Sequence, residues 1–494
     1  MFDTATNIIL IFFFVLNTGV QTMERNRCDS VCRDLPQDDN EPVCLMMSRY
    51  KRGYEFFVNL CHARRTICRE NLENKIGISK IAKPKPVVFQ EALRTTIIIG
   101  QVFSLFPVSG VCNNNVSKVK FEWSSWKCFG LLLSMTGQIL MTIMCIYNTV
   151  YSKASLNIET PVIFYGMTCI TMAMFLRVAT LWPKLVRHIT AVEESDPNYD
   201  TSLNRKCNVT CVIILLLSSF EYVLSLLFAF VKASELKNKD SWYESFAEYL
   251  YPWVFNYLPF SPLLGVMVQL IHFQATFIVI FSDLFIICMS YYLTSRLRHI
   301  NTKVLVARQK HLPETFWERT REDYTRAVKL VRKVDDVISG IIFISFAHNL
   351  FFVCVQLFHT LERSSALGGY KTETYFVFSL IYLIIRSVAV SLITSQINTA
   401  SMSPALVLYD VPTSLYCIEV QRFLDQVTGD KIALTGLQFF RVTRKLLLNI
   451  AGTIVTYELV MFQFDTTTSN ELGTPFPSTN LMNNRSFQRS NFTG

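Results

Sequence analysis

Six amide and imidazole side chains interrupt stretches of sequence that are otherwise apolar, and they are the first candidates for chemistry. They are Gln269, His272, Gln274, His348, Asn349 and Gln356. Three- and four-residue spacing puts Gln269 and His272 on one helical face, while Asn349 and Gln356 share another face two turns apart. The two faces are expected to converge on a polar cavity. Such groups either contact a ligand or form hydrogen bonds between helices.

A second pattern lies in the last apolar stretch, residues 446–464. Thr453, Thr456, Val460 and Gln463 recur at helical spacing and share a face, and Glu458 lies off it. A stripe that is partly polar and partly small suits the wall of an aqueous pore. The alternative is that this face packs on another helix of the same subunit.

Three further charges fall inside apolar stretches: Arg177, Glu221 and Arg386. Charged side chains within a membrane are rare and usually pair with one another, so we expect a buried Glu–Arg pair among them. No nucleophile–base arrangement, zinc-type Cys/His spacing or Gly-rich phosphate loop stands out. The sequence therefore predicts neither an enzyme nor a metal site, and it indicates no cofactor and no nucleic-acid partner.

The elements that must position these residues are long apolar helices. The chain has 494 residues, of which 51% are hydrophobic and 17% charged, whereas soluble domains carry about 25% charged residues. We predict an all-α membrane protein whose domain at 127–464 has seven transmembrane helices, each long enough to cross a bilayer. They are placed at 127–150, 161–182, 210–233, 265–293, 338–361, 375–399 and 446–464. Residues 95–111 contain Gly100, Pro107 and Gly110 and are too short to span, so they are expected to be interfacial or re-entrant.

The basic residues predict the orientation. They concentrate in residues 80–120, 184–206, 296–333 and 422–445, and the alternate connections carry few. The positive-inside rule therefore places the segment 73–126 in the cytoplasm and the tail 465–494 outside. A G-protein-coupled receptor has the reverse topology. The tail contains the two predicted glycosylation sites, Asn484 and Asn491, in Asn-x-Ser/Thr sequons.

The N-terminal segment differs from the rest of the chain. Residues 1–20 are similar to a secretory signal peptide. Residues 21–72 hold five of the fourteen cysteines, and Pro42-Val43-Cys44 with Phe57-Val58-Asn59-Leu60-Cys61 resemble a Kazal-type inhibitor, although that family has six cysteines. An external disulfide module conflicts with the cytoplasmic placement of the basic residues that follow. We interpret 1–72 as a neighbouring secreted protein joined by a gene-model fusion; a genuine extension is the alternative.

Two stretches carry a family resemblance. Thr456-Tyr457-Glu458 and Gln463-Phe464, together with residues 419–448 and 101–111, resemble the sugar-receptor branch of the insect gustatory receptors. The resemblance implies a multi-pass plasma-membrane channel for cations, a homotetramer or a heteromer with related receptors, whose last helix lines a central pore. It assigns Val460, Gln463 and Phe464 to the outer gate, beside Thr453 and Thr456 in the pore.

The resemblance also implies a ligand pocket within each subunit, open to the outside. For small sugars, the amide and imidazole set supplies hydrogen bonds, with Tyr382 and Glu458 as further pocket candidates. Trp242, Tyr243, Trp253 and Tyr257 are available as flat faces for a sugar ring. The alternatives are a seven-helix chemoreceptor that signals through a G protein and, with no internal repeat to support it, a secondary transporter.

Overall fold

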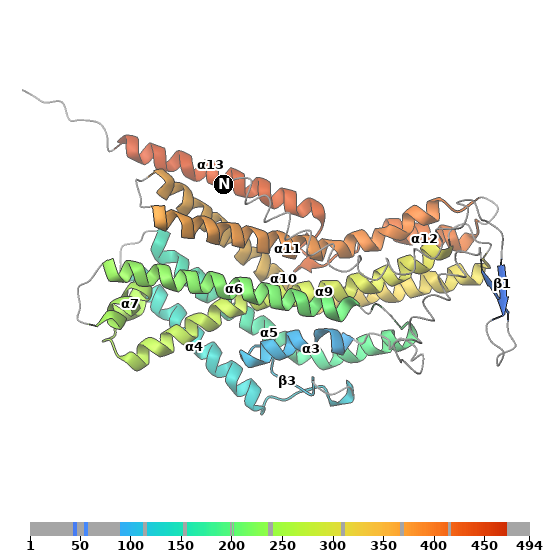
Figure 1. Ribbon diagram of the computed structural model, residues 1–494, viewed down its shortest axis with the longest axis horizontal. Helices are drawn as coiled ribbons and strands as arrows, with labels where there is room; N and C mark the ends of the chain where they lie inside the picture. Colours follow the sequence, from blue (N-terminus) through green and yellow to red (C-terminus); the bar gives the residue numbers. More distant parts are fainter. Residues whose placement is uncertain are drawn as a thin grey trace, which may run out of the picture.

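Long helices dominate the computed structural model, as the apolar stretches predict (Figure 1). The structure describes residues 43–46, 54–57, 89–111, 116–151, 156–197, 200, 202–235, 241–307, 312–365, 370–412 and 416–471. Each predicted span lies within one helix. These helices are α4 (Trp126–Tyr151), α5 (Leu156–Ser195), α6 (Ser202–Glu235), α9 (Pro262–Ala307), α10 (Glu314–Ser365), α11 (Tyr370–Tyr409) and α13 (Arg444–Glu471).

Six helices of the described part are long and apolar enough to cross a membrane. The seventh predicted span lies within α13, where the side chains of 458, 459 and 461–471 fall outside the described set. The count of seven and the direction of the termini therefore stay predictions. The all-helical class of the bundle is confirmed by the arrangement of the helices themselves.

The helices run further than the apolar stretches from which they were predicted. A loop over the basic stretch 296–333, expected from its charge, is wrong for most of this stretch, because α9 continues to Ala307 and α10 begins at Glu314. Trp317, Tyr324 and Val331 are buried along this part of α10. A highly charged helix outside the bilayer can still pack one face against its neighbours when its apolar residues recur at helical spacing. The average polarity of the stretch does not reveal this apolar face.

The core is organised around α9, which packs against α11, α10, α6 and α5. Every side chain from Ile280 to Ser290 is buried, and most of them are apolar, as expected for a helix surrounded by others. In Figure 1, α7 (Trp242–Leu250) lies at one end of the bundle and α12 (Ile418–Gly429) at the other. In the predicted orientation, the α7 end is extracellular and the α12 end cytoplasmic.

The stretch predicted to be interfacial or re-entrant, 95–111, includes the second half of α3 (Phe89–Val102) and the strand β3 (Val108–Ser109). At about 1.5 Å per residue, α3 is too short to cross a bilayer. Its buried face, which includes Leu93 and Ile97, packs against α6 and α9. Gly100 permits this approach, because a Cβ there would lie 2.4 Å from Cζ of Phe281.

The remaining elements are short. β3 pairs with β4 (Lys120–Phe121), next to the 3-10 turn η2 (Val116–Lys118), and β5 (Thr435–Gly436) pairs with β6 (Phe440–Arg441). The helix α8 (Pro252–Phe255) follows α7. In the N-terminal segment, β1 (Val43–Met46) pairs antiparallel with β2 (Tyr54–Phe57). The signal-like residues 1–20 and the rest of the Cys-rich segment lie outside the described residues, so the Kazal-like interpretation stays a prediction.

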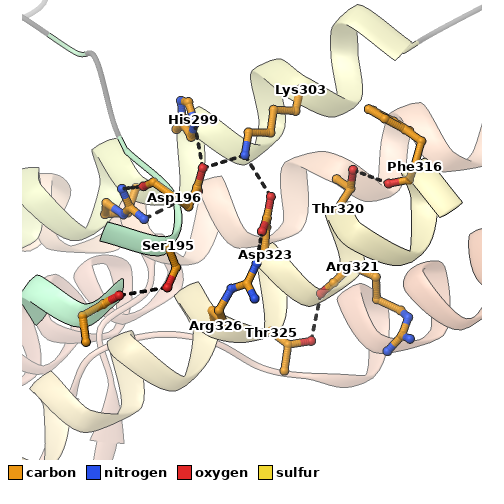
Figure 2. Close-up of polar contacts among 12 residues, drawn as sticks. Ser195, Asp196, His299, Lys303, Phe316, Thr320, Arg321, Asp323, Thr325 and Arg326 are labelled. Atoms are coloured by element: carbon orange, nitrogen blue, oxygen red, sulfur yellow. Dashed lines mark hydrogen bonds and ion pairs between the residues drawn. The ribbon is translucent and has the colours of Figure 1, made fainter. Parts of the chain in front are cut away.

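Charged groups join the helical extensions at the α12 end. Figure 2 shows the ammonium group of Lys303 between two carboxylates, with Asp196 Oδ1 at 2.7 Å and Asp323 Oδ2 at 2.9 Å. His299 and the buried Arg296 also face Asp196. Burial raises the pKa of Asp196, but hydrogen bonds from His299 and Lys303 outweigh burial and hold the pKa below its usual range. Asp196 therefore stays ionised at neutral pH and ties α5 to α9 and, through Lys303, to α10.

A second connection fixes α12. Glu419 accepts hydrogen bonds from Arg321 Nε at 2.8 Å and from Arg422 at 2.7 Å. These hydrogen bonds lower the pKa of Glu419. Asp335 accepts from the backbone N–H and the hydroxyl of Thr435, each at 2.7 Å, and so anchors the β5–β6 pair to α10. The segment that precedes α13 is thus bound to the bundle by charged side chains.

Candidate functional site

A cluster of aromatic and polar side chains lies next to α7, where five helices and the α7–α8 junction meet. We call it the outer aromatic cluster. It comprises Phe164 and Tyr165 of α5, Tyr222 of α6, Tyr251, Trp253 of α8, Gln269 and His272 of α9, and His348 and Phe352 of α10. Three of the six amide and imidazole residues singled out in the sequence are therefore brought together here.

Hydrogen bonds connect the polar members of the cluster. The hydroxyl of Tyr251 donates to Oε1 of Gln269 at 2.6 Å, and Nε2 of Gln269 donates to the hydroxyl of Tyr222 at 2.7 Å. The hydroxyl of Tyr165 lies 2.9 Å from Nδ1 of His272. Gln269 makes one hydrogen bond at each end of its amide, so its second N–H and the second lone pair of Oε1 remain for a ligand hydroxyl.

Two members of the cluster have polar atoms without a partner among the described residues. They are the indole Nε1 of Trp253 and both ring nitrogens of His348. His348 is 6% exposed and stacks on Phe352 with ring centroids 4.3 Å apart. Buried polar groups nearly always have a hydrogen-bond partner, so these atoms suit a ligand that brings donors and acceptors of its own.

The rings of the cluster lie at mutual angles that leave flat faces in several directions. Tyr251 and Trp253 meet edge to face at 5.8 Å, and Tyr165 meets Trp253 at 6.2 Å. On one side Tyr222 also lines a cavity of about 310 Å³ between α3, α6 and α9. Flat aromatic faces beside amide and hydroxyl groups are the combination expected for a neutral ligand with both C–H and O–H surfaces.

Three other predicted pocket residues, Gln274, Gln356 and Tyr382, use their polar groups in contacts outside the outer aromatic cluster. Gln274 donates to the carbonyl of Phe103 at 3.0 Å, and Gln356 donates to the carbonyl of Phe376 at 3.3 Å. Tyr382 bonds Ser218, joining α11 to α6. The side chain of Glu458 falls outside the described set. Their assignment to the pocket stays a prediction.

Asn349 belongs to a buried ion-pair network between α9, α10 and α11. Nε of Arg386 lies 3.0 Å from Oδ2 of Asp283. Nδ2 of Asn349 donates to both carboxylate oxygens, at 3.2 and 3.3 Å, while its Oδ1 accepts from Arg386 at 3.0 Å. Ser345 donates to the same carboxylate. The amide therefore links the two charges.

This network corrects the predicted pairing of Arg177, Glu221 and Arg386. The ion-pair partner of Arg386 is Asp283, while Glu221 accepts a hydrogen bond from Ser379 at 3.0 Å. Arg177 is exposed on α5. The prediction was wrong because helical position gives the depth of a charge but not the neighbour that its side chain faces.

The predicted stripe of α13 is exposed. Thr453, Thr456 and Val460 all lie open on its surface, and Val460 is 42% exposed. Ile450 and Ile454, on other faces of the helix, line a cavity of about 260 Å³ against α10 and α11. The described residues of this stripe therefore do not pack against another helix of the same subunit, which was the alternative. The side chains of Gln463 and Phe464 fall outside the described set.

Sequence reasoning missed the three tyrosines that complete the cluster. Trp253 was among the aromatic candidates, but Tyr165, Tyr222 and Tyr251 come from three other parts of the chain. No spacing in the sequence connects them with Gln269 or His272. Trp242 is exposed, and the hydroxyl of Tyr257 reaches Asn148 at 3.4 Å instead.

Comparison with known proteins identifies the family. The trehalose receptor family matches residues 78–472. Two proteins of Drosophila melanogaster are each 32% identical and cover 76% of this chain: Gustatory receptor for sugar taste 64f, over 382 residues and 81% of its length, and Gustatory receptor 5a for trehalose, over 381 residues and 85% of its length.

A solved structure shares the fold. The insect olfactory receptor OR5 from Machilis hrabei, in complex with eugenol, aligns with a TM-score of 0.60 and 14% identity, covering 76% of this chain and 98% of that chain. These findings confirm the resemblance drawn from residues 419–464 and the multi-pass plasma-membrane location. The chain belongs to the trehalose receptor family, the sugar branch of the insect gustatory receptors.

Proposed function

We propose that this protein is a sugar receptor that is itself a ligand-gated, non-selective cation channel. The observation that carries the channel proposal is the exposed face of α13. Thr453 and Thr456 satisfy their hydroxyls on the carbonyls of Asn449 and Gly452 within the helix, at 3.0 and 2.9 Å. A face with small, internally bonded hydroxyls and Val460 suits a water-filled path between subunits, either four copies of this chain or a mixture with related receptors.

The sugar proposal rests on the outer aromatic cluster together with the names of the curated relatives, of which one is described as a receptor for trehalose. A sugar presents hydroxyls at its edge and C–H groups on its faces. Gln269, His272 and the unpartnered nitrogens of Trp253 and His348 would take the hydroxyls, and the rings of Tyr251 and Trp253 would take the faces. A sugar hydroxyl would bond the remaining donor or acceptor site of Gln269 and compete there with the hydroxyls of Tyr222 and Tyr251.

The proposed orientation follows the basic residues. It puts the α7 end, with the outer aromatic cluster, outside the cell, where a dissolved sugar arrives. It puts the ion pairs of Asp196, Lys303 and Glu419 in the cytoplasm and the end of α13 beyond Val460 outside. The pore would therefore open outward close to the ligand site.

The test is a recording from excised membrane. The full chain is expressed in cultured cells, outside-out patches are pulled into a solution free of nucleotides, and trehalose and other small sugars are applied to the external face. We expect cation current that follows the sugar within milliseconds to seconds. Current that requires cytosolic GTP, or that disappears on excision while intact cells still respond, would favour coupling through a G protein instead.

Substitutions in the cluster should weaken sugar activation. Replacing Gln269 with Ala removes the amide, and a lost hydrogen bond to a buried polar group costs about 1–3 kcal/mol, or roughly five- to a hundredfold in half-activating concentration. Trp253→Phe keeps a ring and removes the free indole N–H, so a smaller shift is expected. Dose–response curves are normalised to surface protein.

Gln138→Ala provides the matched control for this pair. Gln138 is a buried glutamine whose amide donates to the carbonyl of Ile271 at 2.9 Å, outside the cluster. It should leave the half-activating concentration unchanged in channels that reach the surface. Unchanged sugar responses in both Gln269→Ala and Trp253→Phe would reassign the cluster to helix packing.

A further inference from the structure

A large polar cavity opens at the opposite end of the membrane bundle from the outer aromatic cluster. Its volume is about 720 Å³, and it lies between α6, α9, α11 and the first residue of α13. Its charged lining residues are Lys206, Arg298, Arg444 and Asp200. Hydroxyl groups of Ser202, Thr294, Thr399 and Ser403 complete the polar wall.

The charges of this cavity favour an anion. Three cations face one carboxylate, and Asp200 is already engaged, since its oxygens accept from the backbone N–H of Ser202 at 3.1 Å and from the hydroxyl of Ser295 at 3.0 Å. Arg298 donates to the amide oxygen of Gln396 at 2.9 Å, which leaves further N–H groups of its guanidinium, because arginine carries five donors. Lys206 and Arg444 add point charges from two other helices.

The same cavity continues into apolar surface. A narrow cleft of about 20 Å³, lined by Ile214, Leu217 and Ile385 and also by Tyr382 and Arg386, shares Ala389 and Ile393 with it. Beside this cleft, α6 exposes Val212 and Leu216, which are 56% and 66% accessible. A basic cavity beside an exposed apolar helix face matches a molecule with a charged head and a hydrocarbon chain.

We propose that this cavity binds the phosphorylated headgroup of an anionic phospholipid from the cytoplasmic leaflet. Basic pockets between transmembrane helices on that side bind such headgroups, and the volume accommodates an inositol ring with more than one phosphate. One acyl chain lies along the exposed apolar side chains of α6, which include Val212 and Leu216. The headgroup joins Arg444, at the start of α13, to Lys206 and Arg298, so the lipid ties α13 to the rest of the bundle.

Native mass spectrometry of the purified full chain tests the proposal. Phosphatidylinositol 4,5-bisphosphate, phosphatidylserine and phosphatidylcholine are each added to the detergent-solubilised protein. We expect the bisphosphate lipid to bind most tightly and phosphatidylcholine least. The triple substitution Lys206→Gln, Arg298→Gln and Arg444→Gln should weaken binding of the bisphosphate lipid by at least about tenfold, since each basic group near such a headgroup contributes several-fold.

Arg205→Gln is the matched control, because Arg205 is an exposed neighbour of Lys206 on α6 that does not line the cavity. It should bind lipid as the wild type does. Arg298→Gln alone, at an exposed side chain, provides a second variant if the triple substitution fails to fold. Equal lipid binding by wild type and Arg298→Gln, or by wild type and the triple variant, would overturn the proposal.

Soluble anions distinguish a lipid from a free phosphate. Inositol 1,4,5-trisphosphate and inorganic phosphate are offered at the same concentrations as the lipid. We expect the acyl-bearing lipid to bind more tightly than either, because the exposed apolar face of α6 adds contact with an acyl chain. Binding of the soluble anions as tight as that of the lipid would overturn the lipid assignment.

Discussion

Replacing Asp283 with Ala is expected to prevent most of the protein from reaching the cell surface. Asp283 is 1% exposed, and Arg386, its partner at 3.0 Å, is 9% exposed. Without the carboxylate, the buried guanidinium keeps the neutral partners Asn349 and Tyr382 but loses the negative charge that pairs with it. Breaking one side of a buried pair costs about 3–5 kcal/mol. Surface biotinylation and thermal unfolding of the solubilised protein measure the loss.

Two further variants separate charge imbalance from lost volume. Asp283→Leu combined with Arg386→Met removes both charges and keeps apolar bulk, so it should recover much of the surface expression that Asp283→Ala loses. Glu221→Gln is the matched control, because Glu221 hydrogen-bonds Ser379 and attracts the guanidinium without an ion-pair contact, and it should have a small effect. Wild-type expression of Asp283→Ala, or equal losses in Asp283→Ala and Glu221→Gln, would refute the role assigned to the Asp283–Arg386 pair.

Replacing Val460 with Ser is expected to produce a standing leak current in the absence of sugar. Apolar side chains at a narrow constriction exclude ions by keeping it dry. Burying a valine is worth about 1.5–3 kcal/mol, so the loss of even one such contribution raises the open fraction about tenfold. Whole-cell current without ligand, divided by surface protein, is the measurement, and replacement of external cations by a large impermeant cation should abolish it.

Val455→Ser is the matched control, since Val455 lies on the face of α13 toward the cavity with α10 and α11. The same chemical change there should leave the standing current low. If Val460→Ser reaches the surface and neither leaks nor alters ion selectivity, α13 does not line the pore, and the channel mechanism proposed here is wrong. The assignment of Gln463 and Phe464 to the gate stays a prediction. The same recordings, made on variants of these two residues, can test it.

Much of this architecture can be predicted from the sequence because the bilayer imposes a simple rule. A helix must be apolar for about 20 residues to cross it, so stretches such as 265–293 and 375–399 locate α9 and α11. Helical period alone aligned Thr453, Thr456 and Val460 on one face, and all three are exposed in the structure. The residues 419–464 were specific enough to indicate the family.

Other features depended on contacts between distant parts of the chain. Which carboxylate faces Arg386 is decided by how α9 and α11 pack, and sequence position favoured Glu221 no less than Asp283. The tyrosines that bond Gln269 come from α6 and from the end of α7, and they meet it only because five helices converge there. The continuation of α10 back to Glu314 also requires tertiary packing, since its charged residues are helical only where Trp317 and Tyr324 can be buried.

The sequence by itself determined which segments enter the membrane, because that depends on the composition of each segment alone. Only the tertiary structure decided which polar groups become partners, because hydrogen bonds and ion pairs form over a few ångströms between helices whose residues are as many as 192 positions apart in the chain.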